Sequence, residues 1–228
     1  MDETAADRAR LVDEVRAKVR ATHRYLGKDA LDERVLAALA RIPREEFLPA
    51  GERECAYADT ALGIGYQQTI SAPYIVAVMT DLLGPQADDV VLEVGTGSGY
   101  QSAVLAGLVA RVYTLETVQP LAEAAARRLK RLGVDNVEVR WGDGRLGWPE
   151  HAPYDGIIVT AAAPEVPAAL MRQLKSGGHL VVPVGPIEGP QTLLLIAKDE
   201  DGRLSEFGVL PVAFVPLLEA TPPPETKA

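Results

Sequence analysis

Cysteine and histidine are scarce in this chain, and both shortages exclude classes of protein. A single cysteine, Cys55, stands among 228 residues, so no internal disulfide can form, which favours a reducing compartment such as the cytoplasm. The three histidines, His23, His151 and His179, lie far apart and show none of the spacings that metal ligands adopt. We therefore expect no metal site, and the pattern disfavours a zinc hydrolase.

The chain also lacks long apolar runs and a surplus of basic residues. No stretch approaches the roughly 20 apolar residues that a membrane-spanning helix needs, and the opening Met1-Asp2-Glu3-Thr4 lacks the basic and apolar regions of a signal peptide. Lys and Arg total 23 against 32 Asp and Glu, a formal net charge of −9, which argues against a broad nucleic-acid-binding face. We expect a cytoplasmic protein that binds neither membrane nor nucleic acid.

The N-terminal third is predicted to be mainly helical. Apolar residues recur at helical spacing over residues 7–26 and 31–41, and Asp32 is placed to cap the second of these helices. Residues 50–73 show no clear period and are expected to form an ordered loop, which a third helix over 74–83 follows. Residues 1–83 are therefore treated as a helical cap with a loop.

The pattern of apolar residues changes at Asp89. Short β-branched runs alternate with helical stretches near 99–109, 119–132 and 164–174. Such alternation predicts an α/β fold with a doubly wound, mostly parallel sheet covered on both faces. The runs expected as strands are 90–94, 111–115, 137–140, 156–160, 180–184, 192–198, 204–210 and 212–217, with Asp201-Gly202 as a hairpin turn. We expect a single domain over 1–228, with an α/β core at 84–218 and a flexible tail at 219–228.

The first strand of this core runs into the glycine loop Gly95-Thr96-Gly97-Ser98-Gly99. Glycines let the backbone turn sharply and approach a ligand, and ligands of such sheets bind beyond the carboxyl ends of the strands. The G-x-G-x-G spacing differs from the G-x-G-x-x-G of dinucleotide enzymes. Glu93, two residues before the first glycine, can meet a cationic ligand, whereas it would repel pyrophosphate.

Two further acids follow the next two strands. Glu116 lies 21 residues after Gly95, where an acid can accept hydrogen bonds from ribose hydroxyls. Asp143, between Gly142 and Gly144, can accept from an adenine amino group. One acid at each of three strand ends suits a positively charged adenosine ligand, and S-adenosylmethionine is that ligand. The alternative is that Glu116 and Asp143 are solvated loop acids.

A second signal precedes the sheet, in the loop that ends Thr69-Ile70-Ser71-Ala72-Pro73. The Ser71 hydroxyl can form a hydrogen bond beside the cofactor, or it can cap the helix that follows. No histidine lies nearby to act as its base, and the chain has no G-x-S-x-G. A hydrolase nucleophile is therefore not expected.

Seven stretches resemble the protein-L-isoaspartate O-methyltransferase family. The Ser71 segment and the alanine run after the fourth strand of the core are the most specific of them. They run in family order between about residues 31 and 218, at 69–73, 92–100, 142–144, 152–163, 173–178, 182–185 and 214–217. One departure is Gly65-Tyr66-Gln67-Gln68, where many bacterial members have Gly-His-Gly-Gln.

This resemblance implies a Rossmann-like class I S-adenosylmethionine-dependent methyltransferase fold and a monomeric cytoplasmic enzyme. The enzyme would methylate the free carboxylate of L-isoaspartyl, and of some D-aspartyl, residues in damaged proteins, which starts repair through a succinimide. Ser71 carries over as the active-site serine. The residues expected at the cofactor are Gln68, Thr69, Ile70, Ser71, Glu93, Gly95, Thr96, Gly97, Ser98, Glu116, Gly142, Asp143 and Gly144.

Two other functions fit parts of the pattern. A specialised methyltransferase that esterifies one aspartate of a ribosomal peptide product looks similar, but it usually carries extra segments for its partner. A non-catalytic adaptor would keep the fold, although loss of the acids or of Ser71 would then be expected. A nucleic-acid methyltransferase is disfavoured by the net charge and by the lack of a Pro-Pro-Tyr type motif.

Overall fold

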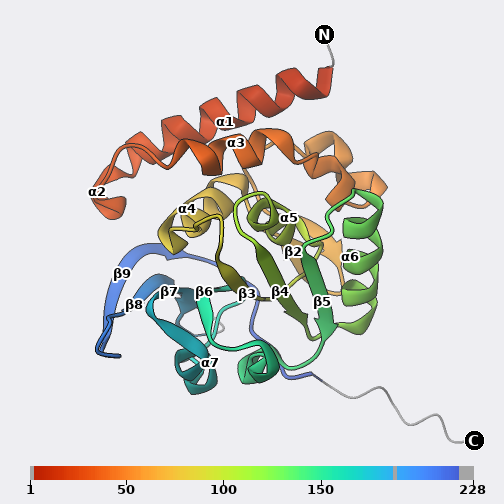
Figure 1. Ribbon diagram of the computed structural model, residues 1–228. Helices are drawn as coiled ribbons and strands as arrows, with labels where there is room; N and C mark the ends of the chain where they lie inside the picture. Colours follow the sequence, from red (N-terminus) through yellow and green to blue (C-terminus); the bar gives the residue numbers. More distant parts are fainter. Residues whose placement is uncertain (1–2, 187–188, 221–228) are drawn as a thin grey trace, which may run out of the picture.

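A seven-stranded sheet forms the centre of the protein (Figure 1), whose residues 3–186 and 189–220 are described by a computed structural model. The strand order is β5-β4-β3-β6-β7-β8-β9. The first five strands in this order are parallel, and β8 and β9 continue the sheet in antiparallel fashion. The strands are β3 (Val90–Val94), β4 (Arg111–Glu116), β5 (Val137–Trp141), β6 (Tyr154–Val159), β7 (Leu174–Val184), β8 (Gln191–Lys198) and β9 (Leu204–Val212).

The central strands are apolar on both faces because helices and turns cover both. Successive side chains of a strand point to opposite faces. Val91 therefore packs in one hydrophobic cluster, together with helices of the N-terminal half. Its neighbour Leu92 packs in a second cluster with Trp148 and with Leu170 of α7 (Ala168–Gln173). This two-sided burial explains why the strands read as continuous apolar runs.

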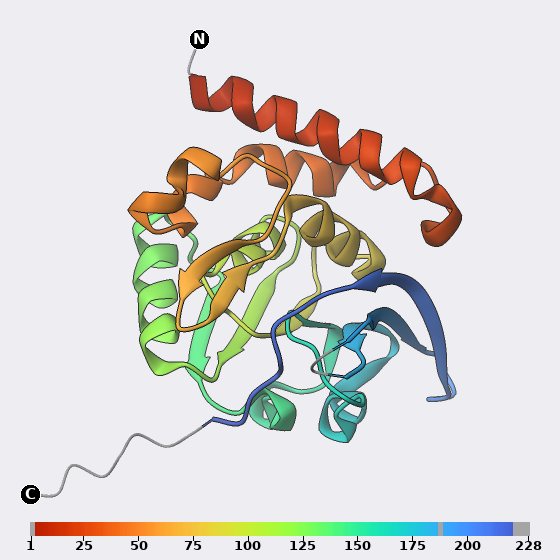
Figure 2. The same ribbon diagram turned by 180° about the vertical axis from the view of Figure 1, so that it is seen from behind.

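The helices form unequal layers on the two faces (Figures 1 and 2). Helices α4, α5 and α6 contact the sheet, while α1 and α3 pack on α4 as a further layer. Their bounds are α1 (Glu3–Ala21), α2 (His23–Leu26), α3 (Glu33–Arg41), α4 (Pro73–Leu83), α5 (Tyr100–Ala106), α6 (Gln119–Arg131) and α7 (Ala168–Gln173), with 3-10 turns η1 (Arg44–Phe47), η2 (Ala50–Cys55), η3 (Gly144–Leu146) and η4 (Pro149–His151). No helix among the described residues is long and apolar enough to span a membrane.

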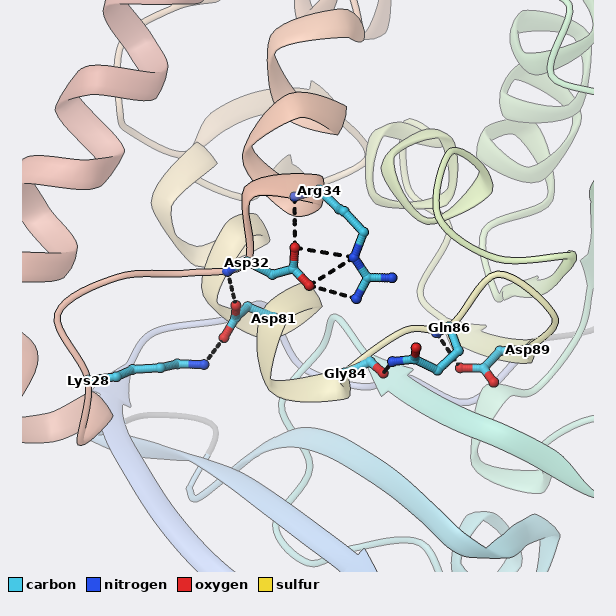
Figure 3. A network of polar contacts seen from close by, with 7 residues as sticks. All are labelled: Lys28, Asp32, Arg34, Asp81, Gly84, Gln86 and Asp89. Atoms are coloured by element: carbon cyan, nitrogen blue, oxygen red, sulfur yellow. Dashed lines mark hydrogen bonds and ion pairs between the residues drawn. The ribbon is translucent and has the colours of Figure 1, made fainter.

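Polar contacts fasten the segment between α2 and α3 to α4 (Figure 3). The buried carboxylate of Asp81 accepts a hydrogen bond from Lys28 Nζ and another, of 2.7 Å, from the backbone N–H of Asp32. The Asp32 side chain in turn accepts from the backbone N–H of Arg34 at 2.8 Å. The predicted cap of α3 is thereby confirmed.

Two sequence-based expectations are wrong. The segment 50–73 is not irregular, because it holds η2 and a hairpin of β1 (Leu62–Gly65) and β2 (Gln68–Ile70). The turn of this hairpin places Tyr66 and Gln67 at positive φ (53° and 59°), without the Asn or Gly that usually marks such turns. Residues 212–217 are also not a strand. Of the described residues after the end of β9 at Val212, only Pro216 forms an isolated bridge, to Ala162.

The chain order places a crevice beside β3. From β3 the chain adds β4 and β5 on one side, and then returns to add β6 and β7 on the other. The loops after β3 and β6 therefore diverge at this point, which is where ligands bind in open α/β sheets. The glycine loop follows β3 at this position.

Candidate active site

A central hollow lies at the carboxyl ends of β3, β4 and β6. Four segments of the chain supply its walls: the hairpin end, the glycine loop, the strand ends and the C-terminal segment 213–218. Figure 2 shows the hairpin and this C-terminal segment side by side over the strand ends. The lining residues are Gln68, Thr69, Val94, Gly95, Gly97, Leu115, Glu116, Thr117, Gly144, Thr160, Ala161, Val215, Pro216, Leu217 and Leu218.

The start of the glycine loop is held by backbone hydrogen bonds to β4. The N–H groups of Gly95 and Thr96 donate to the carbonyl of Leu115, at 2.8 and 3.1 Å. Gly95 has φ +98°, and a Cβ on it would come within 2.4 Å of Thr160 Oγ1, so only glycine fits. Because these N–H groups are already paired within the protein, they do not form the open phosphate cradle of nucleotide-binding loops.

Glu116 closes one side of the central hollow. One carboxylate oxygen accepts from the backbone N–H of Gly97 at 2.7 Å and the other from Val118 at 2.9 Å. Burial raises the pKa of this carboxyl, and the hydrogen bonds from Val118 and Gly97 oppose that rise. Each oxygen keeps a further lone pair, and the side chain lines the hollow, where it can accept from hydroxyl groups.

Asp143 lies in a lateral hollow that adjoins the central one at the end of β5. Residues 140, 142, 143, 146, 147, 149 and 150 line it together with Leu115, which both hollows share. The Asp143 carboxylate accepts from the backbone N–H of Arg145 at 3.0 Å and from its guanidinium at 2.6 Å. Hydrogen bonds from the Arg145 side chain lower the pKa of Asp143, which therefore stays ionised.

Ser71 stands between two further hollows. The inner hollow lies against the glycine loop and is lined by Thr69, Ile70, Ser71, Val76, Gly95, Thr96, Gly97, Ser98, Tyr100, Gln101 and Thr160. The outer hollow, which opens on the other side, is lined by Ala61, Thr69, Ser71, Ala72, Ile75, Val212, Ala213 and Phe214. The N-cap of α4 is Ala72, and no side chain caps this helix from that position, so Ser71 is not its capping residue. Its hydroxyl is left available to a ligand.

Glu93 is the one predicted acid that the structure does not bring to a hollow. Its side chain is fully buried, and one oxygen accepts from the hydroxyl of Ser102 in α5, while the other has no partner among the described residues. Burial raises its pKa to about 8. The sequence predicted that this carboxylate contacts a cationic ligand directly, and this placement does not agree with that prediction. Glu93 packs beneath the loop instead, as a mainly neutral acid at pH 7.

The other expected cofactor residues do line the hollows. Gln68 and Gly144 lie in the central hollow and Gly142 in the lateral one. The inner hollow includes Ile70, Thr96 and Ser98. Thr69 reaches the central, inner and outer hollows, so it stands beside Ser71 at the point where they meet.

Several lining residues were not expected from the sequence. Thr160 could have been found from its place at the end of β6, since that strand neighbours β3. The C-terminal segment carries no such signal. It reaches the hollow because Ala162 donates from its N–H to the carbonyl of Val215 at 2.8 Å and accepts from the N–H of Leu217 at 2.7 Å. The small alanines after β6 thus make room for the chain's own backbone.

The charge of these walls restricts the ligand. Within the described residues, no Lys, Arg or His lines the central or inner hollow, and Glu116 is the only ionisable carboxyl there. A phosphate group would find no counter-charge, whereas a sulfonium and ribose hydroxyls would meet a carboxylate and neutral polar groups. The donor set therefore fits S-adenosylmethionine.

Comparisons with known proteins agree with this geometry. The model of the protein-L-isoaspartate(D-aspartate) O-methyltransferase family matches residues 19–221. The chain is 57% identical over 216 residues to protein-L-isoaspartate O-methyltransferase 2 of Syntrophobacter fumaroxidans, which covers 95% of this chain and 87% of that protein. It is 55% identical to the protein of the same name from Polaromonas sp., covering 91% and 98%.

Solved structures share the fold. One protein-L-isoaspartate O-methyltransferase is 31% identical with a TM-score of 0.75, and the match covers 88% of this chain but only 65% of that longer one. A Plasmodium falciparum chain solved with S-adenosyl-L-homocysteine has a TM-score of 0.75 at 23% identity, covering 92% and 97%. The predicted Rossmann-like methyltransferase fold is thereby confirmed.

Proposed function

The chain belongs to the protein-L-isoaspartate(D-aspartate) O-methyltransferase family, and we propose that its hollows divide the reaction between them. It is an S-adenosylmethionine-dependent protein carboxyl O-methyltransferase that acts on L-isoaspartyl residues. The central and lateral hollows hold the adenosine, the inner hollow holds the methionine end, and the outer hollow admits the damaged peptide. The observation that carries this division is that Ser71 lines both the inner and the outer hollow.

Glu116 and Asp143 hold the adenosine. Glu116 accepts hydrogen bonds from the ribose hydroxyls, because its own protein partners already fix its orientation. Asp143 accepts from the adenine amino group, and its ion pair with Arg145 keeps it charged for that contact. Gly144 lets the chain pass close to the end of β3, since a Cβ on it would lie 2.3 Å from Val94 Cγ1.

Ser71 places the reacting carboxylate. When bound, S-adenosylmethionine supplies a methyl group on a sulfonium sulfur, which a carboxylate oxygen takes in one displacement. The substrate carboxylate is already ionised at neutral pH, so the site needs no strong general base. The Ser71 hydroxyl donates a hydrogen bond that orients this carboxylate, and it forms no covalent bond with the substrate. The rate gain comes from positioning and from exclusion of water.

Two segments exclude water from the crevice. Gln68 and Thr69 of the hairpin close it on one side, and Leu217 and Leu218 close it on the other. The methyl ester leaves the outer hollow, after which the neighbouring backbone nitrogen of the substrate displaces methanol without the enzyme. The resulting succinimide hydrolyses partly to normal aspartate, so methylation starts the repair. D-Aspartyl residues are a further substrate.

The molecular setting is also part of this proposal. The chain acts in the cytoplasm as a monomer and as a single domain, with 1–83 as cap and substrate loop and 84–218 as cofactor core. A surplus of nine acidic charges supports the absence of a nucleic-acid partner. Of the expected flexible tail at 219–228, residues 221–228 lie outside the described residues.

Methyl transfer to paired peptides tests the function. An isoaspartyl peptide and its normal aspartyl twin are incubated with the enzyme and methyl-labelled S-adenosylmethionine, with a D-aspartyl peptide as a third substrate. Labelled ester is expected on the isoaspartyl peptide, and at a lower level on the D-aspartyl one. Equal labelling of the aspartyl twin, or strict dependence on one peptide sequence, would contradict a general repair role.

A further inference from the structure

We propose that Asp59 is a positioning residue, which fixes Ser71 by capping α4 from a distant part of the chain. The proposal rests on the role of Ser71 given above. Ser71 and Ala72 form a two-residue link between β2, which ends at Ile70, and α4, which begins at Pro73. The place of Ser71 therefore depends on how firmly these two elements are held.

The Ser71 side chain does not fix its own position through a hydrogen bond. Its hydroxyl has no hydrogen-bond partner within residues 3–186 and 189–220, so the backbone on either side of Ser71 is what fixes the position of this residue. On one side that backbone is fixed by the pairing of β2 with β1, in which Ile70 faces Leu62. On the other side it depends on the first turn of α4.

That first turn lacks a local cap. Ala72 at the N-cap position offers no side-chain acceptor, and Pro73 has no N–H to satisfy. The N–H of Tyr74 is thus the first free donor of the helix. It donates to Asp59 Oδ1 at 2.7 Å, across a separation of 15 residues. Asp59 performs the task of a capping residue from the loop before β1.

Lys18 of α1 holds Asp59 in turn. Its other oxygen accepts from Lys18 Nζ of α1 at 2.7 Å, and the Asp59 side chain is only 12% exposed. The same ammonium lies 4.7 Å from the centre of the Tyr74 ring, and the hydroxyl of Thr22, the residue that follows α1, forms a hydrogen bond of 2.7 Å with the Tyr74 hydroxyl. Helix α1 therefore holds both Tyr74 and the acid that caps it.

A second cation steadies the neighbouring backbone. The fully buried Arg44 donates from Nη2 to the carbonyl of Thr60 at 3.3 Å, and the charge of Asp59 partly offsets the desolvation that lowers the Arg44 pKa. Asp59 thus has two separable properties, which are the geometry of its bond to Tyr74 and its negative charge. The proposal assigns the control of Ser71 to the geometry.

A matched control exists at α3. Asp32 also accepts from a backbone N–H in a first helical turn, that of Arg34 at 2.8 Å, and also pairs with a cation, the guanidinium of the same residue. Figure 3 shows this cap with its neighbours Lys28 and Asp81. Neither Asp32 nor Arg34 lines the four hollows. Changes at Asp32 therefore report what loss of a cap does without displacement of Ser71.

The test separates geometry from charge in the full-length protein. Asp59→Glu keeps the charge but displaces the carboxylate, and Asp59→Asn keeps the length and an acceptor oxygen but removes the charge. Asp59→Glu is expected to lower kcat on an isoaspartyl peptide by about 10- to 100-fold, because small misplacements cost that much. Asp59→Asn is expected to keep kcat within about threefold while it lowers Tm. Both are expected to leave the Kd for S-adenosylmethionine unchanged, and Asp32→Glu and Asp32→Asn to leave kcat unchanged.

Three outcomes would overturn the proposal. Wild-type kcat in Asp59→Glu would show that the geometry is not needed, and an equal loss in Asp59→Asn would show that charge is the cause. A parallel loss of cofactor affinity would mean that the whole site is disturbed. Should Asp59→Glu not fold, Asp59→Ser is the second variant, since its short hydroxyl does not reach Tyr74, and the same kcat loss is expected.

A double-mutant cycle with Ser71→Ala distinguishes this proposal from the one on which it rests. In the Ser71→Ala background Asp59→Glu is expected to have little further effect on kcat, since the group it positions is gone. Additive losses would refute the coupling while leaving the role of Ser71 intact. Full activity of Ser71→Ala alone would refute the role of Ser71 itself.

Discussion

The carboxylate of Glu116 accepts a 2.7 Å hydrogen bond from the backbone N–H of Gly97, and this contact ties the end of β4 to the middle of the glycine loop. Gly97 has φ +52°, a conformation that glycine adopts at little cost. The same carboxylate faces the central hollow. One side chain therefore shapes the loop that surrounds the cofactor and also presents an acceptor to it.

Replacement of Glu116 is expected to weaken cofactor binding. Glu116→Ala removes a charged acceptor, and hydrogen bonds to charged groups contribute about 1.5–3 kcal/mol, so the Kd for S-adenosylmethionine is expected to rise about 10- to 100-fold. Glu116→Gln is expected to behave similarly, because its amide would direct a donor at the N–H of Gly97 or of Val118. Calorimetric titration measures the Kd of both variants, and an unchanged Kd would show that Glu116 does not contact the cofactor.

Asp143→Ala is expected to weaken the same affinity, because the adenine amino group loses its acceptor. The expected rise in Kd is again about 10-fold or more. Asp201→Ala serves as control, since Asp201 is an exposed acid that also pairs with an arginine two residues on, Arg203. If both variants bind the cofactor as the wild type does, Asp143 is a solvated loop acid that serves only to cap η3.

Ser71→Ala is expected to lower turnover more than cofactor affinity. Removal of one positioning hydrogen bond is expected to cost about 10- to 100-fold in kcat, with the Kd for S-adenosylmethionine nearly unchanged. Steady-state kinetics on an isoaspartyl peptide, together with calorimetry on the same preparation, separates the two effects. Wild-type kinetics in this variant would leave the hydroxyl without a role in the reaction.

The buried acid Glu93 is expected to make stability depend on pH. Its folded-state pKa of about 8 exceeds the ordinary glutamate value of 4.5, so folding takes up a proton between these pH values. The free energy of unfolding therefore falls as the pH rises from about 4.5 to 8, by at most about 1.4 kcal/mol per pH unit from this group, and levels off above that.

Glu93→Gln isolates this contribution. The amide stays neutral, so the difference in unfolding free energy between this variant and the wild type is expected to shift in favour of the variant as the pH rises from 6 to 8. Urea unfolding at several pH values measures it, with Glu206→Gln on the exposed face of β9 as a control that keeps the wild-type slope. A constant difference across this range would mean that Glu93 is ionised in the folded protein.

Local patterns predicted much of the architecture. The strand expected at 90–94 is β3 with the same bounds, and those at 111–115 and 192–198 differ from β4 and β8 by one residue. Buried parallel strands are continuous apolar runs, so they can be recognised without knowledge of their partners. The β1–β2 hairpin was not predicted from the sequence, because its strands are short and its Tyr66-Gln67 turn lacks the usual glycine or asparagine.

Candidate site residues were predictable where they follow strands. Parallel strands bring their carboxyl ends to one edge, so Glu116 and Asp143 could be placed near the glycine loop from spacing alone. Glu93 is a different case, because position in the sequence indicates which edge it is near but not which way its side chain points. It turns to Ser102 in the core instead of into a hollow.

The sequence by itself determined the fold class, the crevice at the glycine loop and the family, since each depends on residue types at short spacings. Only the tertiary structure decided that the C-terminal segment lines the crevice through its hydrogen bonds to Ala162, and that Asp59 caps α4 beside Ser71. Such contacts join residues far apart in the chain. Hydrogen bonds of this kind depend on where packing brings two backbones together, and no local pattern of residues encodes that.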